Sequence, residues 1–315
     1  MDGVLVIAKP AGPTSHDVVA LVRRLAATKR VGHGGTLDPF ASGVLPLFLG
    51  RATRLVEYHL GDRKGYRATV CFGASSTTDD LEGELTPSAA PAPSRAAVEG
   101  ALAGFIGPIS QRPPAYSAIK VAGRRAYAMA RAGEHVELAS REVTIHRLEL
   151  LDWDATDPDR PIAVVDVECS AGTYIRALAR DLGEAVGGAA YLGALVRTAS
   201  GPFRLEGAVS LEHAREAAAG GSERLAALLL PVDAGLDEIP ELIVTDDEVR
   251  AIARGQFIRP KSTDVTGLVA AGPDAPIRIR DMAGRLVAIA TLNDGRLAPD
   301  KVLVESTSSP SGADA

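Results

Sequence analysis

The segment RVGHGGTLDPFASGVLPL, residues 30–47, combines a glycine-rich stretch, a single carboxylate and an apolar run. The glycines before Asp38, Gly35 among them, allow the backbone to approach a ligand closely. Pro39 fixes the chain directly after the acid, and the apolar residues that follow are expected to anchor the segment in a core. The pattern favours a rigid loop with Asp38 at its rim, which suits a positioned nucleophile.

A structural role for Asp38 is the alternative. Asp followed by Pro is a good N-cap and N1 pair, so the same residues fit the start of a helix. The segment lacks the Lys-Ser/Thr pair of a phosphate-binding loop, and Ser42 lacks the G-x-S-x-G context of a nucleophilic serine. No second carboxylate lies close to Asp38 in the sequence, which argues against a local acid pair or metal cage. Helix cap and catalyst both remain open at this point.

The composition is that of a soluble globular protein, with 46% hydrophobic and 23% charged residues in 315. No apolar run reaches the roughly 18 residues that a membrane-spanning helix needs. The first residues, MDGVLVIAKPAGPTS, have neither a basic start nor a long apolar stretch, so no signal peptide is expected. These features predict a cytoplasmic location and no membrane partner.

The two cysteines are expected to be buried, inert thiols. Cys71 and Cys169 lie in the strand-like runs RATVCFG and VVDVECS, and neither belongs to a C-x-x-C pair. The six histidines show no ligand spacing. The sequence therefore predicts neither a zinc site nor a disulfide, and no metal is expected.

Charge is unevenly distributed along a chain whose net charge is −6. Residues 1–67 carry ten Lys/Arg against five Asp/Glu, and residues 112–141 carry six against two. Residues 205–250 carry eleven Asp/Glu against three Lys/Arg. Because screening confines the field of a charge to about 8–10 Å, an acidic protein can still present a basic face to a polyanion.

Helical and strand patterns alternate irregularly over the first 236 residues. Helices are expected from Ser15 as N-cap, from Ser94 to about Phe105, around 124–132 and over 172–188. Strands are expected at 3–10, 65–74, 135–150 and 162–170. Strands and helices without regular βαβ alternation predict an α+β fold, with a mixed, largely antiparallel sheet and flanking helices.

A second, β-rich unit is predicted from about residue 237. A helix with Thr245 and Glu248 in a capping-box pattern should end at Gly255. Short β runs follow at 267–271, 276–281, 284–292 and 301–305. The expected organisation is a catalytic domain at 1–236, a small C-terminal domain at 237–305 and a disordered tail at 306–315.

Five segments, in order, resemble the motifs of bacterial tRNA pseudouridine-55 synthases of the TruB type. They are VLVIAKPAGPTSHDVV, RVGHGGTLDPFASGVLPLFLGRATR, KGYRATVCFGASSTTDDLEG, QRPPAYSAIKVAGRRAYAMARAGE and CSAGTYIRALARDLG. Ser76 stands where the family has a threonine. The resemblance covers nearly the whole chain and implies the pseudouridine synthase fold with a PUA-like C-terminal domain.

The resemblance also implies an activity: isomerisation of the T-loop uridine at tRNA position 55 to pseudouridine, without a cofactor. At the positions that match the family's motifs, the resemblance implies that Asp38 is the catalytic carboxylate and that Arg176 pairs with it. It also implies that Tyr66 stacks on the uracil and acts as the base of the final proton step. The resemblance places Tyr174 in the lining of the pocket and His33 against the flipped-out loop. The other expected substrate-binding positions are Gly35, whose backbone can approach a ligand, and the basic residues Lys9 and Lys120.

These roles suit the chemistry. The base must leave the stack and be held in a pocket where it can turn. A carboxylate can attack, or stabilise charge at, the sugar or the ring, and a guanidinium beside it keeps it ionised. An aromatic face tolerates rotation of the uracil.

The expected partner is the T arm of tRNA, with no obligate protein partner. Basic side chains hold phosphates without reading sequence; the candidates are Lys9, Arg23, Arg24, Lys29, Arg30, Lys64, Lys120, Arg124 and Arg125. A non-catalytic RNA-binding protein or tRNA-folding chaperone is the main alternative, although it would not need the acid. A base-specific glycosidase is the weaker alternative, because no set of residues in the sequence is expected to position a water molecule.

Overall fold

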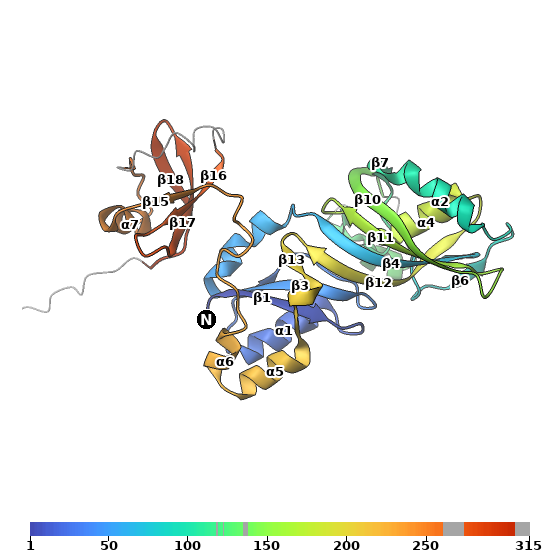
Figure 1. The fold of residues 1–315 in the computed structure, drawn as a ribbon, viewed down its shortest axis with the longest axis horizontal. Helices are drawn as coiled ribbons and strands as arrows, with labels where there is room; N and C mark the ends of the chain where they lie inside the picture. Colours follow the sequence, from blue (N-terminus) through green and yellow to red (C-terminus); the bar gives the residue numbers. More distant parts are fainter. Residues whose placement is uncertain (118, 122, 135–137, 261–273, 306–315) are drawn as a thin grey trace, which may run out of the picture.

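The computed structural model describes residues 1–117, 119–121, 123–134, 138–260 and 274–305. The predicted strand at 267–271 and the predicted tail at 306–315 lie outside these residues. Within them the chain forms one large sheet with helices packed on it, followed by a smaller sheet near the C-terminus (Figure 1).

The large sheet runs in the order β14-β1-β3-β12-β4-β11-β10-β7, with β2 beside β3 and β13 beside β12. Its strands are β1 (Gly3–Lys9), β2 (Val31–His33), β3 (Ser42–Leu49), β4 (Lys64–Phe72), β7 (Gly107–Gln111), β10 (Arg141–Asp154), β11 (Ile162–Cys169), β12 (Ala190–Ser200), β13 (Phe203–Arg204) and β14 (Val209–Ser210). Only the β1–β14 and β3–β12 pairs of its described strands are parallel. The predicted α+β class with a mixed, largely antiparallel sheet is confirmed.

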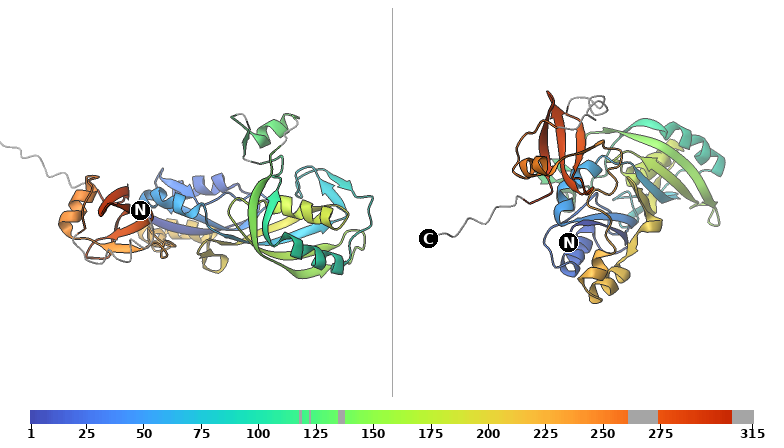
Figure 2. Two further views of the ribbon diagram at one scale, coloured as in Figure 1. Left: turned by 90° about the horizontal axis from the view of Figure 1, so that it is seen from above. Right: turned by 60° about the vertical axis from the view of Figure 1, so that its left-hand side comes forward.

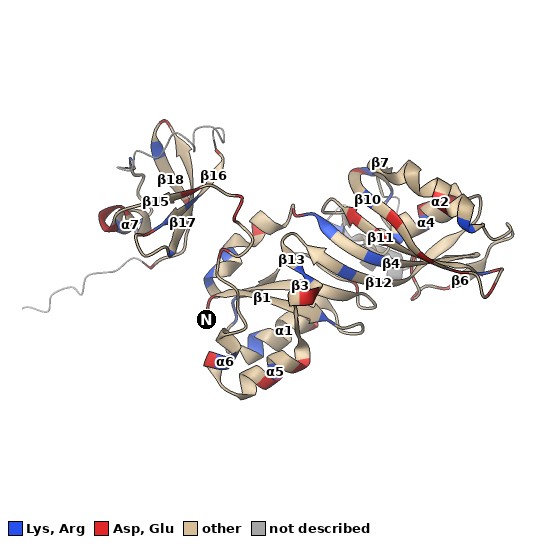
Figure 3. Ribbon diagram, in the orientation of Figure 1, with Lys and Arg blue, Asp and Glu red and all other residues tan. Residues whose placement is uncertain are grey.

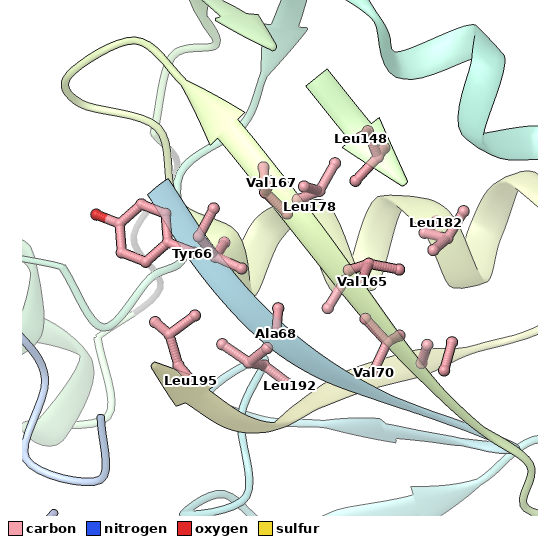
Figure 4. Close-up of a cluster of buried hydrophobic side chains, with 14 of the residues drawn as sticks. Tyr66, Ala68, Val70, Leu148, Val165, Val167, Leu178, Leu182, Leu192 and Leu195 are labelled. Carbon is pink, nitrogen blue, oxygen red and sulfur yellow. The ribbon is translucent and has the colours of Figure 1, made fainter. Parts of the chain in front are cut away.

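Helices cover the sheet in two groups. Helix α4 (Ile175–Ala185) packs on β4 and β12, and helix α2 (Arg95–Leu102) packs on α4 and β10; both contribute to the main core cluster (Figure 4). Helix α1 (Ser15–Leu25) and helix α5 (Leu211–Ala219) pack on β1 and β3. Strand β4 alternates buried and more exposed side chains, as its sequence predicted.

The remaining elements are short. They are α3 (Ala126–Arg131), α6 (Ser222–Ala226), the 3-10 helices η1 (Gly50–His59), η2 (Ala103–Phe105) and η3 (Leu205–Gly207), and the paired strands β5 (Ala74–Ser76) with β6 (Leu85–Pro87) and β8 (Lys120–Val121) with β9 (Arg124–Arg125). Figure 2 shows α3 standing away from the main sheet.

The cap of α1 differs from the prediction. Thr14, not Ser15, is the N-cap: its side chain accepts a hydrogen bond from Asp17 N, and the Asp17 carboxylate accepts one from Thr14 N. Ser15 is 1% exposed and turns its hydroxyl toward another segment. Both residues are good caps, and the tertiary contact of Ser15 decides between them.

The smaller sheet has the order β15-β16-β17-β18. Its strands are β15 (Glu241–Ile243), β16 (Pro276–Arg280), β17 (Leu286–Asn293) and β18 (Arg296–Val302), and helix α7 (Asp246–Ala253) packs on it. The capping box at Thr245 is confirmed, and the helix ends at Gly255 as predicted, where the backbone is left-handed with a φ of +73°. The strand predicted at 301–305 lies earlier, because the turn at Asp294–Gly295 starts β18 at Arg296.

The smaller sheet is attached to η1 of the larger body. Leu55 is fully buried in a cluster with Leu236, Ile289 and Leu303. Lys301 pairs with Glu57 at 2.8 Å. Apolar and ionic contacts therefore both hold the C-terminal sheet against residues near the N-terminus.

Candidate active site

Asp38 lies in the loop between β2 and β3. The two strands pair antiparallel, and Gly34 N donates to Pro46 O at 3.1 Å, so both ends of the loop are fixed by the sheet. No helix follows Asp38: Ala41 N donates to Asp38 O in a turn, and β3 begins at Ser42. The helix-cap interpretation is therefore wrong, and the predicted anchored loop is found.

Buried side chains hold this loop from below. Ser15 Oγ accepts from Leu37 N at 2.8 Å and donates to Leu37 O at 3.0 Å. Lys9 Nζ donates to Ala41 O at 2.7 Å and to Pro39 O at 3.2 Å. Because Lys9 is 1% exposed, it cannot reach phosphates as predicted; its ammonium group is used by the loop carbonyls.

Arg197 of β12 is a third anchor that the sequence did not suggest. It is 1% exposed, and its guanidinium donates to Val44 O at 2.7 Å, Gly35 O at 3.1 Å and Thr36 O at 3.3 Å. Gly35 has a φ of +131°, a conformation that other residues rarely adopt. The predicted freedom of this glycine is used to turn its carbonyl group toward Arg197.

Arg176 brings two carboxylates together. Its Nε lies 3.1 Å from Asp38 Oδ2, and its Nη1 lies 3.2 Å from Asp80 Oδ2. The guanidinium also donates to Thr78 O at 3.2 Å and to Tyr116 O at 3.0 Å. The pairing of Arg176 with Asp38 was predicted; no role was assigned to Asp80, although it lies in the segment KGYRATVCFGASSTTDDLEG that resembles a family motif.

The contact between Arg176 and Asp38 is an ion pair without good hydrogen-bond alignment. The Nε atom is buried and has no hydrogen-bond partner among the described residues. The Asp38 side chain is 36% exposed, whereas that of Asp80 is 3% exposed. Of the two carboxylates that contact Arg176, Asp38 is therefore the accessible one and Asp80 the buried one.

Burial raises the pKa of Asp38 above the ordinary 3.8, and the Arg176 guanidinium offsets only part of this rise. The neighbouring carboxylate of Asp80 adds to the rise, whereas Lys9 opposes it. The environment thus disfavours the charged form more than Arg176 favours it. The result is a more basic, more nucleophilic carboxylate than a solvated aspartate.

Tyr66 lies on β4 at the end of the large core cluster, where Figure 4 shows its hydroxyl group pointing away from the labelled aliphatic side chains. The residue is 8% exposed. Burial raises the pKa of its phenol above 10, while the charge of Arg197 acts in the opposite direction. Tyr66 is consequently a neutral phenol at ordinary pH.

Tyr174 is fixed where β11 leads into α4. Its backbone N donates to Gln111 Oε1 at 2.8 Å, and Gln111 Nε2 donates to its carbonyl oxygen at 3.0 Å. The Arg141 guanidinium lies 4.6 Å from the centre of its ring. These contacts leave a half-buried aromatic ring two residues before Arg176.

A hollow of about 510 Å³ lies beside His33. Its lining includes His16, Arg23, Lys29 and Arg30, and the three basic side chains are exposed. His16 and His33 meet edge to face, with ring centroids 5.7 Å apart. The basic face predicted near the N-terminus therefore borders the loop of Asp38.

Other predicted basic residues are placed differently. Lys64 is 7% exposed and donates to Ser200 Oγ at 2.9 Å, so it faces the interior rather than a phosphate. Arg124 is exposed and pairs with Glu134 at 2.7 Å. The side chains of Lys120 and Arg125 lie outside the described residues. Figure 3 shows the blue of Lys and Arg on β4 and β12 and the red of Asp and Glu on α5 and α7.

Cys169 is buried as predicted, whereas Cys71 is only half-buried; both are free thiols. In the described part of the chain, His, Cys, Asp and Glu side chains form no group of three able to hold a metal ion. In the same residues no helix is long and apolar enough to cross a membrane.

The mixed sheet, with an arginine-paired aspartate in a loop beside a buried tyrosine, is the architecture of a pseudouridine synthase. Residues 23–175 match the model of the TruB family pseudouridylate synthase N-terminal domain, and residues 176–237 match that of the tRNA pseudouridylate synthase B C-terminal domain. The chain belongs to the TruB family of pseudouridylate synthases, as its motifs predicted, and is an isomerase.

Similar curated proteins span almost the same length. The chain is 44% identical to tRNA pseudouridine synthase B of Bradyrhizobium diazoefficiens, over 98% of this chain and 88% of that protein. It is also 44% identical to the protein of the same name from an Arthrobacter species, over 98% and 99%.

The fold is also that of a solved protein. A chain in the crystal structure of a Cbf5-Nop10-Gar1 complex superposes with a TM-score of 0.71 at 25% identity, over 96% of this chain and 85% of that chain.

Proposed function

We propose that the protein isomerises uridine 55 in the T loop of tRNA to pseudouridine, with the base flipped out of its stack and Asp38 as the nucleophile. The observation that carries the proposal is the Asp38 carboxylate, accessible at the loop rim and paired with Arg176. The relatives named tRNA pseudouridine synthase B support the choice of tRNA.

The reaction exchanges one bond of C1′ for another. The bond from C1′ to N1 breaks, the uracil rotates, and a bond from C1′ to C5 forms; a proton leaves C5 and N1 gains one. Asp38 attacks, or stabilises charge at, the sugar or the ring; Arg176 offsets part of the burial that raises its pKa and directs the carboxylate. The atoms balance without an oxidant or reductant, so the proposed reaction needs no cofactor.

Tyr66 supplies the face on which the uracil turns. An aromatic ring allows rotation that fixed hydrogen bonds would resist. Its raised pKa means that a role as base in the last proton transfer requires help to ionise the phenol. The Arg197 guanidinium opposes the burial that raises the pKa of Tyr66, so the base role is assigned to Tyr66 acting with Arg197.

RNA phosphates are assigned to the exposed basic residues around the hollow at His33, namely Arg23, Lys29 and Arg30. His33 and Tyr174 then border the flipped-out loop. Affinity should come from the phosphates, and specificity from the folded shape of the T loop. The proposed partner is tRNA, with no obligate protein partner. The proposed location is the cytoplasm.

Residues 1–236 are assigned to catalysis and residues 237–305 to a PUA-like domain that contacts tRNA beyond the T arm. Ile258 and Leu297 pair through their backbones and point inward, so their neighbours Phe257, Arg259 and Arg296 share the outer face. Phe257 is 70% exposed beside a hollow of about 460 Å³. An exposed ring with two arginines suits an unpaired nucleotide.

Incubating the protein with a T-arm hairpin and mapping pseudouridine tests the proposal. The expected result is modification at the position equivalent to 55 and nowhere else in the hairpin. Tight binding with no pseudouridine would favour an RNA-binding protein or tRNA-folding chaperone. Release of free uracil would show a glycosidase instead.

A further inference from the structure

Arg180 lies one helical turn after Arg176 on α4 and therefore on the same face. Its Nη1 lies 2.8 Å from Asp79 Oδ2, and the two side chains are 15% and 16% exposed. Asp79 stands between Thr78 and Asp80, both of which contact Arg176. A second arginine–aspartate pair thus runs beside the first.

The backbone of Asp79 is left-handed, with a φ of +60°. Non-glycine residues seldom adopt this conformation, and Asp and Asn tolerate it better than most. The turn is closed by Asp79 N donating to Ser76 O at 3.1 Å and is tied to β12 by Leu192 N donating to Asp79 O at 3.0 Å. The ion pair with Arg180 fixes the side chain of Asp79 within this turn.

Arg180 also holds the second segment that contacts Arg176. Its Nη2 donates to Arg112 O at 2.8 Å, and the same segment presents Tyr116 O to Arg176. The remaining contact of Arg180 is with Asp181, its neighbour on the helix, at 2.7 Å. One guanidinium therefore connects both loops that supply acceptors to Arg176.

We propose that Arg180 is a positioning residue for Arg176: through Asp79 and Arg112 O it fixes the acceptors that aim the Arg176 guanidinium at Asp38. The inference rests on the proposed function. Without the pair, the turn at Asp79 relaxes, Arg176 loses its alignment, and the chemical step slows while RNA binding does not change.

The best variant is Asp79→Asn, because asparagine keeps the left-handed turn and removes the charge. Arg180→Met tests the pair from the other side. Asp181→Asn is the matched control, because Asp181 also pairs with Arg180 but belongs to α4 and to neither of the two loops. Thermal melting of each variant separates misfolding from a loss of alignment.

Single-turnover pseudouridine formation on a T-arm hairpin should fall by about tenfold or more in the first two variants, with Kd within about twofold. The double variant should be no slower than the slower single one, because the two residues act as a unit. Asp181→Asn should stay near wild type. Rates within about twofold of wild type for Asp79→Asn, or an equal loss in Asp181→Asn, would overturn the proposal.

A second readout needs no activity: titration of the Asp38 carboxyl by NMR, assigned with Asp38→Asn. The charged and titratable groups facing Asp38 are Arg176 from α4, Asp80 from the adjoining turn, Lys9 from β1 and Tyr66 from β4. Misalignment of Arg176 should move the titration to higher pH in Asp79→Asn. An unchanged titration would contradict the inference, whereas inactivity of the wild-type protein would contradict the proposed function alone.

Discussion

At the scale of single residues, the site depends on how the same chemical group is used in different surroundings. Lys9 and Arg197 are basic, but burial commits them to backbone carbonyls of the loop. Arg176 is buried as well, yet one of its nitrogens faces an accessible carboxylate. Sequence motifs singled out Asp38, Tyr66 and Arg176, and the structure brings Arg176 into contact with Asp38. They could not separate buried from exposed cations, because burial depends on which strands become neighbours.

Asp38→Asn should abolish turnover and leave tRNA affinity within about tenfold, since phosphate contacts carry most of the binding. The change removes the nucleophile while keeping the side-chain shape. Rapid-quench assays and filter binding on one preparation would measure both. Pseudouridine formed by this variant would contradict the assignment of Asp38 as nucleophile.

The pH dependence of the chemical step should reflect the pKa of Asp38. Its reactive form is ionised, so the rate falls as pH drops through the folded-state pKa, which burial has raised above 3.8. Single-turnover rates measured across the acidic pH range, with hairpin melting followed in parallel, would give the apparent pKa at which the rate falls. An apparent pKa at or below that of a free aspartate would show that Arg176 lowers the pKa of Asp38 more than burial raises it.

At the scale of elements, adjacent residues at the start of α1 have separate tasks. Thr14 caps the helix, whereas Ser15 holds Leu37 in the catalytic loop. The sequence predicted the helix and its N-terminus but assigned the cap to Ser15, since both hydroxyls fit that role. Periodic patterns identified α2, α4, β4 and α7 well. The strand after Asp294 was displaced because the turn there depends on backbone conformation.

Replacing each of these residues by alanine should separate the tasks. Thr14→Ala should lower the free energy of unfolding by about 1 kcal/mol and leave kcat unchanged. Ser15→Ala leaves Leu37 N and O without their hydroxyl partner and should lower kcat more than KM changes. Urea unfolding and steady-state assays of both variants provide the comparison. A matching loss of kcat in Thr14→Ala would show that the helix as a whole, not Ser15, positions the loop.

At the scale of the whole molecule, the C-terminal sheet is joined to the catalytic body more closely than its separate sequence pattern indicated. Leu55 and Leu236 are buried in one cluster with Ile289 and Leu303 of the C-terminal part, so removing residues after 236 would expose apolar surface. The buried Arg278 also donates to Ile239 O and Asp237 O and so holds the connecting segment. Its contribution to RNA binding is therefore better tested in the full chain.

Phe257→Ala should weaken binding of whole tRNA by roughly 1–3 kcal/mol and leave binding of a T-arm hairpin unchanged, since one stacked base is lost. Arg259→Ala and Arg296→Ala should each reduce the salt slope by about one. Met282→Ala is the matched control, because Met282 is as exposed, at 74%, in another turn. Equal losses on tRNA and hairpin would refute a separate contact.

The anchoring of the catalytic loop has a consequence for the order in which the protein is made. Ser15 and Lys9 contact the loop across 22 to 32 residues of chain, but Arg197 reaches it across 162. Asp38 leaves the ribosome early, yet its loop lacks its last anchor until β12 has been synthesised and inserted between β3 and β4. Because domains fold largely as units during synthesis, a nascent chain that ends before Arg197 holds the nucleophile without the means to use it. We therefore expect newly made chains to acquire activity only after β12 has left the ribosome.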